Sequence, residues 1–71
     1  MKISYDSKYD VLYMKFSDGK VADTIEADGG LLIDYGERKE VIGIEIINAS
    51  SMMKTKPLQE IVIKIQEDAE A

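Results

Sequence analysis

GLLIDYG at residues 30–36 and VIGIEIIN at residues 41–48 are the segments that decide the fold. Each is a run of aliphatic, largely β-branched residues, which favour the pleated surface of a sheet. The charged link between them is short enough to predict an antiparallel hairpin. Each run also carries one carboxylate in its interior, Asp34 or Glu45, and an isolated acid is costly to bury. The two acids therefore either face solvent or have a function.

Two further strands are predicted before this hairpin. Residues 1–6 alternate apolar and polar side chains, as a strand with one buried face does. Residues 11–16 form the next strand, with Leu12, Met14 and Phe16 on one face and Val11, Tyr13 and Lys15 on the other. The polar turn at residues 6–8 is short enough to pair them as a second antiparallel hairpin. Residues 21–28 allow an extended edge segment, although alanines and acids weaken it. The Asp-Gly-Gly breaker at residues 28–30 ends that segment.

The last third of the chain leaves two interpretations open. Residues 48–51 offer N-cap side chains for one helical turn, and Pro57 prevents a longer helix there. Residues 58–66 fit either a strand or a helix. Their isoleucines favour the strand, because β-branched side chains suit a pleated surface. Residues 67–71 are acidic and are expected to fray.

The alternation predicts a core on one face of the sheet. That face collects Leu12, Met14, Phe16, Leu31, Ile33, Ile42, Ile44, Ile46, Ile61, Ile63 and Ile65. The opposite face also keeps apolar side chains, namely Val11, Tyr13, Leu32, Val41, Ile47 and Val62. A sheet with two partly apolar faces needs a cover, and a chain of 71 residues is too short to supply two layers.

We therefore predict one small globular domain over residues 1–66, followed by the acidic tail at residues 67–71. Its fold class is α+β, mainly β, with a small antiparallel sheet of four to five strands and one short helical segment. Because small domains without disulfides gain stability by association, we expect a homodimer or a larger homo-oligomer.

Composition excludes several classes of function. The chain has no Cys and no His, which excludes disulfides and the usual nucleophilic triads, and we expect no cofactor. Its 14 acidic and 9 basic residues give a net charge of -5. This balance argues against nucleic acid and suits a basic protein partner. No apolar stretch approaches the ~20 residues of a membrane span, and the start turns polar too early for a signal peptide, so we expect no membrane partner and a cytoplasmic protein.

Tyr13, Asp34 and Glu45 form the candidate site. The alternation places all three on the face away from the main core, on strands expected to be neighbours. Two acids and a phenol on one surface are suited to acid–base chemistry or to ligand binding. The simpler interpretation is that the acids bond to turn amides or pair with Lys15 and Lys64 across the sheet.

Two other features have structural interpretations. Gly43 interrupts a β-branched run, and such a glycine weakens a strand unless another group approaches closely, so we expect close packing over it. The aspartates Asp6, Asp10, Asp18 and Asp28 match no calcium-binding loop, so we expect them to cap turns rather than to bind a metal.

Several motifs also occur in a familiar order. They are Tyr5-Asp6, Asp10-Val11-Leu12-Tyr13, Ile33-Asp34-Tyr35, Val41-Ile42-Gly43-Ile44-Glu45-Ile46 and Ala49-Ser50. Over residues 3–50 they resemble the bacterial and archaeal family called domain of unknown function 2283. The chain departs from that family at residues 36–40, where members tend to carry an Asp- and Gly-rich turn. The resemblance implies a small single domain whose members occur in some cases beside small toxin-like genes, and it assigns no activity and no catalytic residues.

Two functions remain open at this point. The first is a non-enzymatic, acidic protein-interaction module that binds and restrains another protein, such as a small toxin. The alternative is a homo-oligomer that binds a small molecule or uses its carboxylates in catalysis, with a site around Tyr13, Asp34 and Glu45 at a subunit interface. The first predicts an exposed apolar patch with an acidic rim, and the second predicts a concave pocket around the carboxylates.

Overall fold

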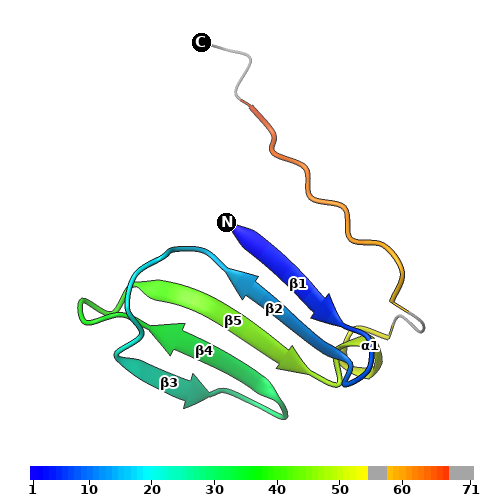
Figure 1. Ribbon diagram of the computed structural model, residues 1–71, viewed down its shortest axis with the longest axis horizontal. Coiled ribbons are helices and arrows are strands. Elements are labelled where there is room, and N and C mark those ends of the chain that lie inside the picture. Colours follow the sequence, from blue (N-terminus) through cyan, green and yellow to red (C-terminus); the bar gives the residue numbers. More distant parts are fainter. Residues whose placement is uncertain (55–57, 68–71) are drawn as a thin grey trace.

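The computed structural model describes residues 1–54 and 58–67. It contains one five-stranded antiparallel sheet and one short helix (Figure 1). The strands are β1 (Lys2–Asp6), β2 (Val11–Lys15), β3 (Asp23–Glu26), β4 (Leu31–Tyr35) and β5 (Val41–Ile47), and the helix is α1 (Ala49–Met52). This architecture confirms the predicted fold class. No helix in the described part of the chain has the length and apolar character needed to cross a membrane.

The strands lie in the order β1-β2-β5-β4-β3, so β5 is central and β1 and β3 are the edges. Both predicted hairpins are confirmed, as β1 pairs with β2 and β4 pairs with β5. The segment at residues 21–28 contains the edge strand β3. The breaker after it is also confirmed, since Gly29 and Gly30 have positive φ of 53° and 104°, which glycine adopts without steric cost.

The strand register defines two faces of the sheet, because residues directly opposite one another point to the same side. The apolar face carries one row that crosses all five strands, Ile3, Met14, Ile44, Ile33 and Ile25, and a second row of Tyr5, Leu12, Ile46 and Leu31. The polar face carries Ser4, Tyr13, Glu45, Leu32 and Glu26, with Lys2, Lys15, Gly43, Asp34 and Thr24 beside them.

The core is smaller than the alternation predicts. Among the described residues, the buried apolar side chains are those of Leu12, Ile42 and Ala49. Even Ile44, in the middle of the central strand, is only half-buried. The reason is that the sheet is a single layer and α1, with four residues, is too short to cover its apolar face. The predicted core is therefore formed only in part.

Ile42 is buried because the sheet is irregular at this point. Asp34 lies opposite Gly43, whereas Tyr35 lies opposite Val41, so Ile42 is an extra residue in β5 and forms a β-bulge. The loop after β2 passes over its side chain, and a Cβ built at Gly19 would lie 2.9 Å from Ile42 Cδ1. The loop also contributes a hydrogen bond from Phe16 N to Ile42 O of 2.8 Å.

The strand predicted over residues 58–66 is wrong, and so is the helical alternative. Residues 58–67 have no regular secondary structure, and the segment runs outward from the α1 end, past β1 (Figure 1). Ile61, Ile63 and Ile65 are 44%, 55% and 87% exposed, so they do not join the core. A β-branched run forms a strand only when a neighbouring strand supplies hydrogen-bond partners. Residues 55–57 and 68–71, which include most of the predicted tail, lie outside the described residues.

Candidate functional site

The three predicted site residues lie on the polar face, as expected. Glu45 on β5 is directly opposite Tyr13 on β2, and Asp34 on β4 is opposite Gly43 on β5. The Tyr13 hydroxyl donates a hydrogen bond to Asp34 Oδ2 at 3.2 Å. On the other side of the carboxylate, Thr24 Oγ1 donates to Asp34 Oδ1 at 2.7 Å. A polar chain therefore links β2, β4 and β3 across the sheet.

Gly43 makes this chain possible. A Cβ built at Gly43 would lie 2.7 Å from the Tyr13 hydroxyl oxygen and 2.9 Å from the backbone oxygen of Met14, both too short for a real contact. Because glycine lacks this atom, the Tyr13 ring crosses β5 and reaches the next strand. The predicted close packing over Gly43 is thus confirmed, and the approaching group is the phenol of the candidate site itself.

The electrostatics of the cluster keep Tyr13 protonated. Burial raises the pKa of Tyr13 above its ordinary value of 10.0, and the hydrogen bond to Asp34 and the charges of Asp34 and Glu45 raise it further. At neutral pH the phenol is therefore a hydrogen-bond donor. Among the described residues, Asp34 bonds to Thr24 and Tyr13 rather than to the predicted lysine or turn amide.

A second polar cluster joins the β1–β2 turn to α1. The carboxylate of Asp10 accepts hydrogen bonds from the Tyr5 hydroxyl, from Ser50 N at 3.1 Å and from Ser50 Oγ at 2.8 Å. Its backbone oxygen accepts from Ala49 N at 2.9 Å. Asp10 thereby supplies the cap of α1, since Asn48 at the N-cap makes no side-chain capping bond and free helix amides need a partner.

This role of Asp10 was not predicted from the sequence. Capping of the local turn is confirmed for Asp6, whose Oδ1 accepts from Lys8 N at 3.0 Å and Tyr9 N at 3.3 Å. The carboxylate of Asp10 instead accepts a hydrogen bond from Ser50, which lies forty positions later in the sequence. Both Asp10 and Ala49-Ser50 were among the family motifs, yet no spacing in the sequence indicated that they meet.

The Asp10 cluster also affects the phenol of Tyr5. The hydrogen bond to Asp10 raises the pKa of Tyr5 above 10.0, and burial and the charges of Asp10 and Asp6 act in the same direction. As with Tyr13, the cluster holds a neutral tyrosine against a carboxylate. In the described part of the chain, no three acidic side chains converge as a metal site would require.

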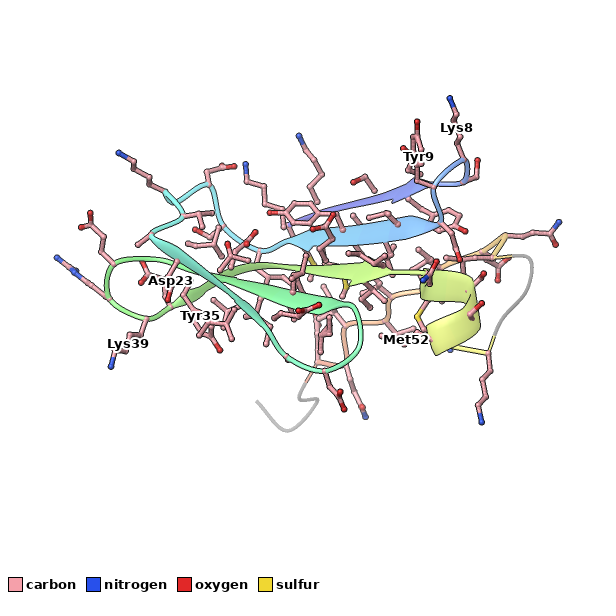
Figure 2. The ribbon with its side chains drawn as sticks, turned by 90° about the horizontal axis from the view of Figure 1, so that it is seen from below. Lys8, Tyr9, Asp23, Tyr35, Lys39 and Met52 are labelled. Atoms are coloured by element: carbon pink, nitrogen blue, oxygen red, sulfur yellow. The ribbon has the colours of Figure 1, made fainter. Side chains whose placement is uncertain are left out.

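A shallow hollow of about 500 Å³ lies at one end of the sheet. It is lined by Ile25 and Tyr35 together with the charged residues Asp23, Glu37 and Lys39. Figure 2 shows Asp23, Tyr35 and Lys39 gathered at this end. Tyr13, Asp34 and Glu45 do not line the hollow. The structure therefore brings the predicted residues together on the polar face, outside this hollow, and their role in ligand binding stays a prediction.

Comparison with known proteins relates the chain to proteins whose function is unknown. The chain is 40% identical over 52 residues to the uncharacterized protein MJ0789 of Methanocaldococcus jannaschii. The match covers 73% of this chain and 44% of that relative, so the chain spans less than half the length of the relative. No solved structure gave a significant match.

A family model matches residues 2–50. This region runs from the start of β1 to Ser50 and includes both tyrosine–carboxylate clusters. The segment at residues 58–67 lies outside it. The chain belongs to the DUF2283 family of proteins of unknown function.

Proposed function

We propose that this protein is a non-enzymatic interaction module that works as a homodimer, with the apolar face of its sheet as the surface that binds the second copy. One observation carries the proposal. The row formed by Ile3, Met14, Ile44, Ile33 and Ile25 crosses all five strands, and none of these side chains is buried. Ile25 is exposed and the other four are half-buried, and a contiguous apolar surface that stays partly accessible to solvent is typical of protein interfaces.

A second copy of the chain is suited to cover this apolar face. A two-fold dimer places the same surface of both subunits in contact, and an isoleucine-rich row is complementary to another isoleucine-rich row. A buried interface would also supply the second layer that a sheet with one apolar face requires. The excess of acidic residues supports a basic protein as the further partner that the dimer binds and restrains, and this part of the proposal rests on composition and on the family resemblance.

The alternative function, a site for a small molecule or for catalysis, has less support. A ligand site is expected to be concave, whereas Tyr13 and Asp34 do not line the hollow at the end of the sheet. In addition, both oxygens of Asp34 already accept hydrogen bonds. The cluster therefore supports a structural role for these residues better than a chemical one.

Two neighbouring substitutions on β3 test the proposal. Ile25 is 49% exposed on the apolar face, so Ile25→Lys leaves the monomer folded and places a charge in the proposed interface. Glu26→Gln changes the net charge by the same amount on the polar face. In sedimentation equilibrium, Ile25→Lys should weaken dimerisation strongly and Glu26→Gln should leave it nearly unchanged. Equal dissociation constants for both variants and the wild type would refute this interface.

A further inference from the structure

We infer that residues 60–64 of a second copy add to β1 as a sixth, parallel strand of the sheet. This inference rests on the proposed homodimer and names the element that each subunit gives to the other. Two parts of the described chain have no neighbouring strand on at least one side. One is the exposed isoleucine segment after α1, and the other is the free edge of β1.

The segment has the composition of a strand without the partner that a strand needs. Val62 is 65% exposed, and the flanking Ile61 and Ile63 are 44% and 55% exposed. These β-branched residues have high strand propensity, and removing their exposed apolar surface from water is favourable. A segment of this kind is most stable when it pairs with an open sheet edge, where unpaired backbone groups act as a template.

The sheet offers two such edges, and the charges favour β1. The edge strand β3 carries Asp23 and Glu26, which would repel Glu60 of an added segment. The sequence of β1 is KISYD, with Ile3 and Tyr5 on the apolar face. An added strand with isoleucines at the matching positions extends that face by one strand.

Charge complementarity also selects the register. Residues 60–64 read EIVIK, which has the spacing of KISYD with the charges exchanged. In a parallel pair with Lys2 beside Glu60, Asp6 is beside Lys64, and both ends form opposite-charge neighbours. The two isoleucines of the segment then lie beside Ile3 and Tyr5. Opposite charges on neighbouring strands stabilise a sheet, and like charges destabilise it.

The antiparallel arrangement is disfavoured by the same charges. If the same five residues pair in the opposite direction, Glu60 lies beside Asp6 and Lys64 beside Lys2. Figure 1 shows that the segment leaves α1 and runs in the direction opposite to β1 of its own chain. Pairing within one chain would therefore be antiparallel, whereas the parallel pair requires a second copy. In a two-fold dimer each subunit receives one such strand.

A cross-linking experiment tests the register directly, since the chain contains no Cys. Equal amounts of Ile3→Cys and Ile61→Cys chains are mixed and oxidised, and the same is done with Ile3→Cys and Ile63→Cys chains. Neighbouring strands are ~4.8 Å apart, within the range that a disulfide spans. The parallel register predicts the mixed disulfide in the first pair. Preferential cross-linking of the second pair would overturn it, because the antiparallel register places Ile63 beside Ile3.

A charge-reversal cycle provides an independent measurement on the whole chain. Lys2→Glu and Glu60→Lys should each weaken dimerisation on the order of tenfold, because each creates like-charge neighbours at two equivalent places. The double variant keeps the wild-type net charge and should recover most of the affinity. Lys20→Glu, in the exposed loop after β2, changes the net charge as Lys2→Glu does and serves as the control.

The outcomes separate this inference from the proposed function. A wild-type dimer without recovery in the double variant and without a mixed disulfide would overturn the added strand and leave the apolar interface standing. A disulfide within single chains that carry both Ile3→Cys and Ile63→Cys would show antiparallel pairing in one chain, which also overturns it. A wild-type monomer at all concentrations would overturn both proposals.

Discussion

Tyr13 reaches Asp34 across the central strand of the sheet. The two residues are on β2 and β4, with β5 between them, and the hydroxyl of Tyr13 donates to Asp34 Oδ2 at 3.2 Å. The ring passes over Gly43, where any side chain would obstruct it. Three residues on three strands thus depend on one another, and this dependence leads to the first two predictions.

Gly43→Ala should destabilise the protein by about 1–3 kcal/mol, the usual cost of forcing extra atoms into a packed site. The added Cβ would lie 2.7 Å from the Tyr13 oxygen, so the phenol must move and its bond to Asp34 is lost. Urea unfolding measures this cost. The cost should be smaller in a Tyr13→Phe background, because the closest contact is then absent. An equal cost in both backgrounds would show that the Tyr13 hydroxyl is not the obstructing group.

Asp34→Asn should lower the free energy of unfolding by about 1–2 kcal/mol. The carboxylate accepts hydrogen bonds from Tyr13 and Thr24, and the amide replaces one acceptor oxygen by a donor. Glu45→Gln is the matched control, since it makes the same charge change on the same face. It should have a smaller effect than Asp34→Asn. Equal losses would indicate that the charge of this face, rather than the hydrogen-bonded chain, stabilises the sheet.

Asp10→Asn should cost about 1–3 kcal/mol, because the carboxylate holds Ser50 and Tyr5 at once. Asparagine tolerates the positive φ of 57° at this position, so the substitution tests the carboxylate rather than the backbone. Hydrogen exchange of the α1 amides should rise in the variant. Asp28 is an exposed turn residue, so Asp28→Asn should leave both stability and exchange unchanged. Equal effects of the two substitutions would show that the hydrogen bonds of the Asp10 carboxylate do not stabilise α1.

Alkaline pH should destabilise the fold through Tyr5 and Tyr13. The pKa of each phenol is higher in the fold than its ordinary value of 10.0, so the folded state holds these protons more tightly than the unfolded state does. The resulting stability is complete below the ordinary value and is lost as the pH rises through the raised pKa.

Tyrosine substitutions check this assignment in thermal unfolding at a series of alkaline pH values. Tyr13→Phe should reduce the alkaline loss of stability, because one of the two perturbed phenols is removed. Tyr9→Phe, at a position that is 65% exposed, should not reduce it. If Tyr9→Phe reduces the loss as much as Tyr13→Phe does, the clusters are not its origin.

Much of the sheet was predictable because a period of two assigns faces without any knowledge of the topology. The common face of Tyr13, Asp34 and Glu45 follows from alternation, and the two hairpins follow from the short polar links between their strands. The packing over Gly43 was also predictable, since a glycine in a β-branched run indicates a close approach. The identity of the approaching group required the register, which alternation alone does not specify.

The remaining features depend on contacts that are distant in the sequence. The bond between Asp10 and Ser50 joins residues forty positions apart, and the bulge at Ile42 follows from how two strands meet at their ends. The predicted strand at residues 58–66 is wrong for the single chain because strand propensity does not supply a neighbouring strand. The burial of the apolar face was overestimated because a single-layered sheet has no second layer to cover that face.

The mass of the protein in solution tests the central claim most directly. Sedimentation equilibrium of the wild-type chain at micromolar concentration should give twice the chain mass of 8.0 kDa, with dissociation only on strong dilution. Such a dimer is what the partly exposed, isoleucine-rich row on the apolar face predicts. A mass of 8.0 kDa throughout the micromolar range, with a cooperative unfolding transition, would show that the single-layered sheet is stable alone and would contradict the proposed function.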